Sequence, residues 1–168
     1  TKVYEDFDQE TLDNEYLISR TVPSLEPFIA DYGKFSAEGR DNLDCRVDVS
    51  CGDHPDQLLD IFPAKGKDGK AAPVFIFIHG GYWRMLSHRE SSFMAENMVA
   101  NGIAVIAVNY SLAPDASIDT IVQQCREAIA WTWRNAADFG ADPDQIFVGG
   151  SSAGGHLTGM MVAGGWHD

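Results

Sequence analysis

The pattern of apolar and polar positions predicts a sheet made of short strands, most of them buried on both faces. Continuously apolar runs of strand length cover residues 73–78, 103–108 and 146–148, which is typical of strands covered on both sides. Residues 45–49 alternate apolar and polar, as a half-buried edge strand would, and residues 57–62 form a second short strand. A helical stretch follows each buried run, so the chain predicts a parallel sheet with right-handed crossovers, an α/β fold.

Capping residues and apolar spacing mark the helices that follow these strands. The motif Ser87-x-x-Glu90 is a capping box and predicts a helix that stops at Asn101-Gly102. Ser117 can cap a long amphipathic helix that closes at Gly140. The apolar stripe of this helix consists of Ile118, Ile121, Val122, Cys125, Ile129 and Trp133. A stretch of small residues, 157–163, forms the third helix.

The first part of the chain has a different pattern and predicts an N-terminal arm and helix, residues 1–43, ahead of a main domain at residues 44–168. Residues 1–22 are acidic with few apolar anchors, which indicates an arm with a helical turn or two. Pro23 opens a more regular helix, for which Gly39 is the predicted stop. Its apolar residues recur at three- and four-residue spacing, and they are Leu25, Phe28, Ile29, Tyr32 and Phe35.

Composition favours one acidic globular domain. The 168 residues are 45% hydrophobic and carry a net charge of -13, with a pI near 4.5, which suits one core and argues against nucleic acid or an anionic membrane as a partner. The apolar runs are too short to span a bilayer, and no signal-peptide pattern is visible in the first residues. The three cysteines Cys45, Cys51 and Cys125 form no CxxC pair, so we expect a reducing, cytoplasmic environment.

The most informative stretch is the glycine-rich turn Gly149–His156, between the last apolar run and the third helix. It places Gly150-x-Ser152-x-Gly154 at a bend from strand to helix. We expect a strained backbone at Ser152, so that Cβ atoms two residues before and after would collide, and both positions are glycine. Such a turn lifts one hydroxyl clear of the sheet edge, where the N–H groups of the helix N-terminus also point. Ser152 is therefore the candidate nucleophile.

Phosphate-binding loops also place glycines between a strand and a helix, but the sequence fits neither common form. GxGxxG fails because Ser152 occupies the position of the middle glycine. GxxxxGK[ST] matches Gly150 and Gly155, but the next two residues are not lysine and serine or threonine. Ser151 does not suit the role of nucleophile, because Ala153 stands where its second flanking glycine would be.

A second glycine cluster, Gly80-Gly81, could complete an oxyanion hole. The tetrahedral intermediate of acyl transfer needs two or more preorganised N–H donors, and losing one costs about 3 to 4 kcal/mol of barrier. The N–H of Ala153 supplies one donor, and the glycine pair follows a buried strand and lets the backbone approach closely. Ligands bind beyond the carboxyl ends of parallel strands, so both clusters can face one site. An ordinary tight turn is the alternative for Gly80-Gly81.

Three motifs together resemble the α/β-hydrolase fold. They are His79-Gly80-Gly81-Tyr82-Trp83, Asn109–Pro114 and Gly150–Leu157. The sequence is similar to the esterase/lipase branch related to hormone-sensitive lipase, and the HGGYW form is especially similar to kynurenine formamidase (arylformamidase)-like members. The resemblance extends from about Asp44 to the end of the chain. It implies a three-layer α/β-hydrolase fold with a mostly parallel sheet, of which only the N-terminal part is present.

The resemblance also implies a function and a set of site residues. It implies a serine hydrolase that cleaves small carboxylic esters or aryl formamides through an acyl-enzyme, without a cofactor, and Ser152 is its nucleophile. The implied oxyanion donors are the N–H groups of Gly80, Gly81 and Ala153. Tyr82 and Trp83 would line or support the acyl pocket, with simple packing of the loop as the alternative.

The residues after Ser152 hold no convincing acid or base. The triad order of this fold is serine, then Asp or Glu, then histidine. His156 lies in the first turn of the last helix and is better explained as a packed or capping residue, and His167 and Asp168 lie beyond its far end. We therefore expect the acid and base in a C-terminal segment that this chain lacks, and we expect the chain alone to be inactive or nearly so.

Other classes of protein stay open. The exposed apolar edge beside the strand that leads to Ser152 could pair with a second copy and form a homodimer. A non-catalytic small-molecule binding module could use the same fold, and an acyltransferase could use the same turn. We expect no metal, because the five histidines show no HxxxH-type pairing. They are His54, His79, His88, His156 and His167.

Overall fold

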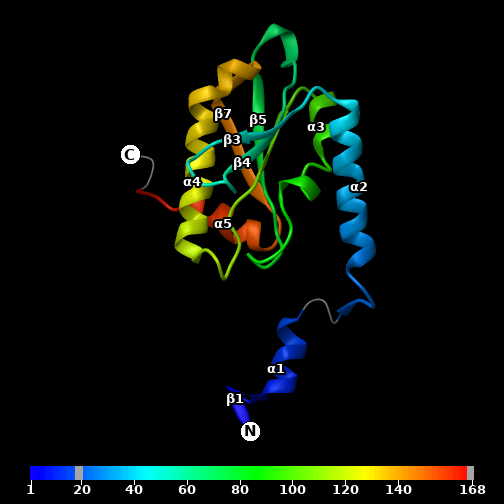
Figure 1. The fold of residues 1–168 in the computed structure, drawn as a ribbon, viewed down its shortest axis with the longest axis vertical. Coiled ribbons are helices and arrows are strands. Elements are labelled where there is room, and N and C mark those ends of the chain that lie inside the picture. The colour runs from blue at the N-terminus through cyan, green and yellow to red at the C-terminus, as the bar shows by residue number, and fades with distance from the viewer. Residues whose placement is uncertain (18–20, 166–168) are drawn as a thin grey trace. The chain divides into compact units, whose positions relative to one another are not determined.

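The computed structural model describes residues 1–17 and 21–165, and Figure 1 shows the order of the elements. The chain divides into two units, Thr1–Asp31 and the part from Tyr32 onward. The predicted positions of His167 and Asp168 lie outside the described residues. Of the helices that are described, none is both long enough and apolar enough to cross a membrane.

The first unit contains a small hairpin and a helix. Strands β1 (Lys2–Tyr4) and β2 (Phe7–Asp8) pair antiparallel, and helix α1 (Gln9–Tyr16) follows, with the Asp8 carboxylate accepting a hydrogen bond of 2.9 Å from the Thr11 N–H. The sequence predicted an arm with a helical turn or two and no hairpin. Strands of two and three residues are too short to show alternating apolar and polar positions.

Helix α2 (Glu26–Asn42) continues past Gly39, so the predicted stop is wrong. Gly39 is buried, and a Cβ at this position would lie 3.8 Å from the Cβ of Ala95. The Ser36 hydroxyl on the same face accepts a hydrogen bond of 3.1 Å from the Ser92 N–H. The face of small residues is therefore the buried one, whereas Tyr32 and Phe35 of the predicted apolar stripe are 41% and 46% exposed.

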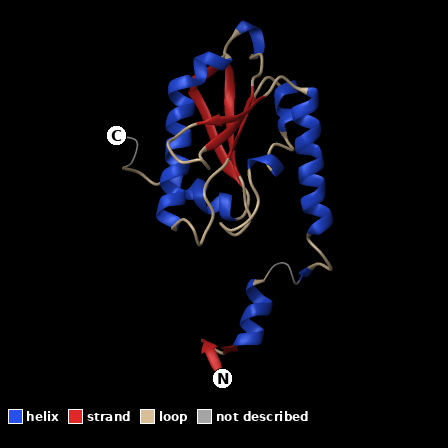
Figure 2. Ribbon diagram, viewed as in Figure 1, coloured by secondary structure: helices blue, strands red, loops and turns tan. Residues whose placement is uncertain are grey.

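A five-stranded mixed sheet forms the centre of the second unit (Figure 2). In spatial order its strands are β3 (Arg46–Ser50), β4 (Leu58–Phe62), β6 (Ala104–Val108), β5 (Ala72–Ile78) and β7 (Ala141–Gly150). Strand β5 is parallel to both β6 and β7, while β3 and β4 are antiparallel to their neighbours. The α/β sheet and the predicted edge strand are confirmed.

The register of the three parallel strands aligns their carboxyl ends. Ile78 at the end of β5 lies opposite Val108 of β6 and Gly150 of β7. The loops that follow β5, β6 and β7 therefore leave the sheet at the same edge, as the sequence predicted for the two glycine clusters.

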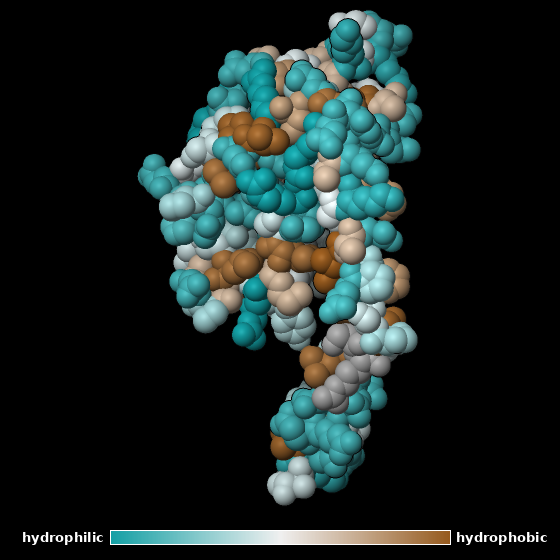
Figure 3. All heavy atoms as spheres, turned by 45° about the vertical axis from the view of Figure 1, so that its right-hand side comes forward, coloured by the Kyte–Doolittle hydropathy of each residue, from teal (hydrophilic) through white to brown (hydrophobic). Residues whose placement is uncertain are grey.

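Helices cover both faces of this sheet. On one face, helices α4 (Ile118–Asn135) and α5 (Ala153–Val162) pack through Ile121, Cys125 and Leu157 against Ile78. On the other face, Ala95 of α3 (Ala95–Ala100) packs with Phe62 and Val105. Figure 3 shows that the outer surface seen in that view is largely hydrophilic with separate hydrophobic patches.

The helix predicted from Ser87 to Asn101 is interrupted. The capping box is present, with the Ser87 N–H donating 3.0 Å to Glu90 Oε2, but it opens only a short 3₁₀ helix, η3 (His88–Glu90). The Ser91 hydroxyl donates to the Ser87 carbonyl at 2.6 Å. Side-chain hydrogen bonds of this kind compete with helix formation, and α3 begins only at Ala95.

Helix α4 agrees more closely with its prediction. The Ser117 hydroxyl accepts a hydrogen bond from the Thr120 N–H, as a cap does. The chain then forms the 3₁₀ helix η4 (Ala136–Phe139) and ends the helical segment at Gly140, whose φ is 75°. The two ends of the predicted stripe are more exposed than expected, since Ile118 is 39% and Trp133 58% exposed.

A buried ion pair joins α2 to the sheet. Arg40 Nε donates to Asp60 Oδ2 at 2.9 Å, and only 1% of the Asp60 side chain is exposed. Removing one partner of such a pair leaves an uncompensated buried charge. The Arg40–Asp60 contact therefore links the fold of α2 to that of β4.

We expect Arg40→Met to lower the free energy of unfolding by about 3 kcal/mol, because the Asp60 carboxylate would stay buried without its partner. Urea denaturation followed by circular dichroism measures this change. The matched control is Lys34→Met on the same helix. Lys34 pairs with Glu38 at 3.9 Å in an exposed position, so its loss should change stability by no more than about 0.5 kcal/mol. Equal effects of the two variants would contradict the assignment.

Candidate active site

Ser152 stands between β7 and α5 in a strained backbone conformation. Its φ and ψ are 53° and -115°, a region that residues with a side chain rarely adopt. A Cβ at Gly150 would lie 2.4 Å from the Gly154 carbonyl oxygen, and a Cβ at Gly154 would lie 2.0 Å from that of Ile78. The predicted strain at Ser152 and the need for glycine on both sides are thus confirmed. The Ser152 side chain is exposed.

The loop after β5 lies directly against this turn. A Cβ at Gly80 would come within 3.3 Å of the Ser152 Cβ and 2.8 Å of the Ser151 carbonyl oxygen. The fold therefore brings together two clusters that are about seventy residues apart in the sequence.

Gly81 forms the tight turn that reverses this loop. Its φ is 102°, and a Cβ would lie 2.1 Å from the Met85 carbonyl oxygen. Its own carbonyl accepts hydrogen bonds from the N–H groups of Arg84 at 2.9 Å and Met85 at 3.0 Å. The glycine pair therefore forms a tight turn, and the N–H of Gly81 takes no part in these two turn hydrogen bonds.

Ala153 is the first residue of α5, and it is buried. The first N–H groups of a helix have no partner within the helix, and the helix dipole favours negative charge at this end. The N–H of Ala153 therefore has no partner within α5, and the Gly80 loop approaches the turn that precedes it.

His79 and Tyr110 form a buried pair beneath the Gly80 loop, which the sequence did not predict. Their rings stack with centroids 4.0 Å apart and planes at 6°. The Tyr110 hydroxyl donates 2.9 Å to the His79 carbonyl, and His79 Nδ1 lies 2.7 Å from the Gly80 carbonyl oxygen. Burial lowers the pKa of His79 to about 4 and raises that of Tyr110. The available signal was their position, since His79 directly follows β5 and Tyr110 is the second residue after β6.

Tyr82 and Trp83 continue the loop with positive φ angles of 59° and 58°. Tyr82 is 59% exposed, whereas Trp83 packs against the core between α4 and α5. The Trp83 ring meets the His156 ring edge to face at 5.2 Å, and its carbonyl accepts a hydrogen bond of 2.7 Å from the Ala113 N–H. Trp83 therefore ties the loop to α5 and to the loop after β6.

His156 occupies the first turn of α5, as predicted. Its side chain is exposed, its ring contacts Trp83, and its N–H donates 3.1 Å to the Ser152 carbonyl oxygen. These contacts agree with a packing role.

Neither Ser152 nor Gly80 lines either of two hollows on the surface of the described residues. One lies between the 51–57 loop and α4, with His54, Gln57 and Glu127 in its walls. The other lies beside β7 and is lined by Trp133, Ile146 and other residues of α4, α5 and β7.

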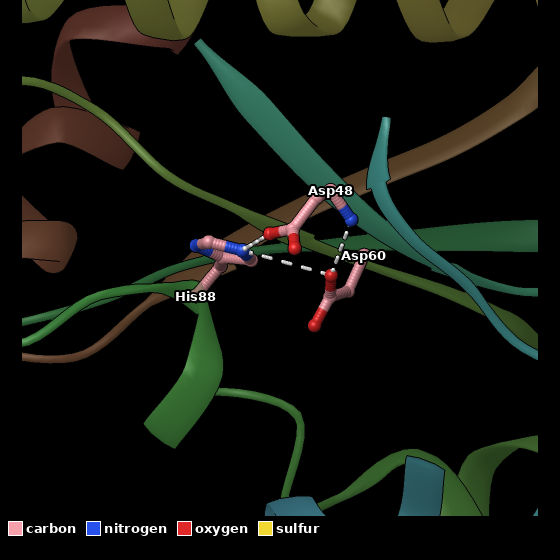
Figure 4. Close-up of side chains that lie close together, drawn as sticks. All are labelled: Asp48, Asp60 and His88. Carbon is pink, nitrogen blue, oxygen red and sulfur yellow. Dashed lines mark hydrogen bonds and ion pairs between the residues drawn. The ribbon is translucent and has the colours of Figure 1, made fainter. Parts of the chain in front are cut away.

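A cluster of acidic groups and a histidine was also missed from the sequence (Figure 4). One ligand atom each from Asp48, Asp60 and His88 lie within 4.8 Å of one another. His88 Nε2 is 2.8 Å from Asp48 Oδ1, and the Asp48 N–H donates 3.0 Å to Asp60 Oδ1. Carboxylates and imidazole can bind a metal ion. The other partners of these side chains show whether their oxygen atoms are free to do so.

Two arginines complete this cluster. Arg40 pairs with Asp60, and Arg89 Nη2 pairs with Asp48 Oδ2 at 2.6 Å. The hydrogen bond from His88, followed by those with Arg89, lowers the pKa of Asp48 against the opposing effect of desolvation. Guanidinium groups occupy carboxylate oxygens that a cation would need, so the arrangement is a charge-paired network that holds η3 against β3 and β4.

Comparison with known families and curated proteins places the chain among hydrolases. The BD-FAE family model matches residues 59–165. Over 120 residues the chain is 32% identical to kynurenine formamidase of Danio rerio, covering 71% of this chain and 39% of that protein. Over 113 residues it is 36% identical to the esterase LipC of Mycobacterium tuberculosis, covering 67% of this chain and 28% of LipC. The chain thus spans about two fifths or less of the length of these relatives.

Solved structures agree with this result. A crystal structure of a Silicibacter sp. TM1040 protein, which carries an assignment as a thioesterase, matches with a TM-score of 0.76 and 27% identity over 90% of this chain and 55% of that chain. The butyrate-bound esterase Est2 of Thermogutta terrifontis matches with a TM-score of 0.58 and 25% identity over 68% of this chain and 42% of that chain. The predicted α/β-hydrolase fold is confirmed.

We expect Gly154→Ala to destabilise the chain by about 3 kcal/mol or more, because its Cβ would overlap the backbone of β5. The matched control is Gly159→Ala on the same helix, where a Cβ would meet nothing within 4 Å. That variant should stabilise the chain by up to about 1 kcal/mol through helix propensity. Thermal or urea unfolding compares the two, and a Gly154→Ala protein as stable as the original would contradict the close approach.

Proposed function

Because the chain belongs to the BD-FAE family of α/β hydrolases, we propose that it supplies the nucleophile and the oxyanion hole of a serine hydrolase. The observation that carries the proposal is the strained turn at Ser152, an exposed serine with the Gly80 loop against it. A backbone held in such a conformation is typical of a nucleophile elbow.

In the proposed reaction, the Ser152 Oγ attacks the carbonyl carbon of an ester or a formamide. A base accepts the hydroxyl proton, and the carbonyl oxygen becomes an oxyanion that accepts hydrogen bonds from the N–H groups of Gly80, Gly81 and Ala153. Collapse of this intermediate expels the alcohol or the arylamine, which takes the proton from the base, and leaves the acyl group on Ser152. Water then attacks the acyl-enzyme, gives a proton to the base, and releases the carboxylic acid as the serine recovers its proton.

The base and its acidic partner are proposed to come from residues outside this chain. Within the described residues, the Ser152 side chain makes no capping hydrogen bond, and the nearby His156 contacts Trp83 instead. A serine without a base is a weak nucleophile at neutral pH. The curated relatives are more than twice as long as the matched segment, which leaves room for both residues in the whole protein.

The proposed substrates are small carboxylic esters or aryl formamides. The relatives that support this choice are a kynurenine formamidase and several esterases. Tyr82 and Trp83 lie on the loop that contacts Ser152, with their rings 5.8 Å apart in an edge-to-face arrangement. Aromatic side chains at this position could line the acyl pocket and pack against an aryl leaving group.

We expect Ser152→Ala in the whole protein to lower kcat for p-nitrophenyl acetate by about 10⁴-fold, because the acyl-enzyme cannot form. It should also abolish the mass adduct formed with a fluorophosphonate probe. The matched control is Ser151→Ala, which removes the neighbouring exposed hydroxyl and should retain both activities. Full hydrolysis by the Ser152→Ala protein would overturn the proposal, and a folded whole protein that never reacts with the probe would favour a binding module.

Substrate class can be tested by comparing N-formylkynurenine with phenyl acetate. A formamidase should show the higher kcat/KM for N-formylkynurenine, because the formyl group needs little acyl space beside Trp83. A general esterase should instead accept phenyl acetate and phenyl butyrate with the higher kcat/KM. Turnover of neither compound class by the whole protein would remove both substrates from the proposal.

A further inference from the structure

His79 and Tyr110 supply a separate hydrogen-bond donor to each of the first two carbonyls of the loop after β5. The Tyr110 hydroxyl donates 2.9 Å to the His79 carbonyl and lies 3.4 Å from that of Gly80. His79 Nδ1 lies 2.7 Å from the Gly80 carbonyl oxygen. A carbonyl can only accept, so the proton of the neutral ring is on Nδ1. Two successive carbonyls therefore face the same buried pair.

The orientation of these carbonyls determines that of the N–H groups. In a trans peptide unit, the C=O of one residue and the N–H of the next point in opposite directions. Among the described residues, the cis bond is elsewhere, at Ala113-Pro114. The N–H of Gly80 therefore points away from the carbonyl of His79, and the N–H of Gly81 points away from the carbonyl of Gly80. Both donors project away from the Tyr110 hydroxyl and the His79 ring.

The proposed oxyanion would form beside Ser152, next to this loop. Gly80 contacts the Ser152 turn, since a Cβ there would lie 3.3 Å from the Ser152 Cβ. The two rings are held rigidly, because His79 and Tyr110 are each only 1% exposed and stack at 4.0 Å. An oxyanion hole is effective when its donors are oriented before the charge develops.

We propose that His79 and Tyr110 are positioning residues that orient the N–H groups of Gly80 and Gly81 for the oxyanion. This inference rests on the proposed function of Ser152. Neither side chain touches the substrate in this role, because each acts through the peptide unit that it holds. The buried pair stays neutral near pH 7, since burial lowers the pKa of His79 and raises that of Tyr110, so both donors keep their protons there.

The test uses Tyr110→Phe in the whole protein, which keeps the stacked ring and removes the donor. We expect kcat for p-nitrophenyl acetate to fall by about tenfold or more while KM changes by less than about twofold, because donors made for the transition state lose their orientation. The affinity for phenylboronic acid, which forms a tetrahedral adduct on serine, should fall by a factor similar to that of kcat/KM. The matched control is Tyr32→Phe, whose ring stacks on Phe93 away from the site and whose kinetics should be unchanged.

A second pair of variants tests His79. The amide of His79→Asn can replace the Nδ1–H donor, so this variant should retain more of kcat than His79→Leu. An unchanged kcat and boronate affinity in Tyr110→Phe would overturn the inference, as would equal losses in the two His79 variants. If Ser152→Ala keeps full activity, the proposed function fails instead.

A readout that needs no hydrolysis covers the case in which a variant folds poorly in the longer protein. In the 168-residue chain, ¹⁵N relaxation of the Gly80 and Gly81 amides should show order parameters that fall in Tyr110→Phe and stay unchanged in Tyr32→Phe. Rigid Gly80 and Gly81 amides in Tyr110→Phe would contradict the positioning role, whatever the activity of the whole protein.

Discussion

The close approach between the start of α5 and the end of β5 is the constraint on which the candidate site depends. A Cβ at Gly154 would lie only 2.0 Å from the Ile78 carbonyl oxygen, and the Ser151 N–H points to the same oxygen at 3.4 Å. Because α5 begins against this strand, the Ser152 turn must form beside the loop that continues from Ile78. The strand register then brings Gly80 to the same edge of the sheet. The position of Ser152 and the strain in its backbone thus both follow from the packing of the α5 main chain against that of β5.

The loop between β5 and α3 is held at both ends by polar groups buried in the fold. At its start, Tyr110 and His79 bind the carbonyls of the first two residues. At its far end, η3 is attached to the sheet through His88, Asp48 and Asp60, with Asp48 itself at a positive φ of 53°. The middle of the loop, with Tyr82 and Trp83, carries further positive φ angles. Fixed ends allow such a strained segment to keep one conformation.

The elements that the sequence predicted best are those governed by local chemistry. The buried strands, the Ser117 cap and the glycines around Ser152 all follow from apolar runs or from contacts within a few residues. The predicted stop at Gly39 was wrong because a distant residue, Ala95, packs on it. After Ser87 the helix is interrupted both by the local Ser91–Ser87 hydrogen bond and by the distant Ser36, whose hydroxyl accepts from the Ser92 N–H. The His79–Tyr110 stack and the Asp48–His88 contact join residues 31 and 40 positions apart. Neither the spacing of apolar residues nor a short sequence motif can reveal such contacts.

At Ser152, the residue that the proposed chemistry needs differs from the residue that would make the backbone most stable. At its φ of 53° and ψ of -115°, glycine would remove a strain on the order of 1 to 3 kcal/mol. If stability were the sole criterion, glycine would be the better residue at this position, and the segment from Gly149 to Gly155 would be more glycine-rich than it is. The hydroxyl thus persists where the main chain disfavours any side chain. Optimising this protein for thermal resistance alone would tend to remove the hydroxyl on which the proposed chemistry depends.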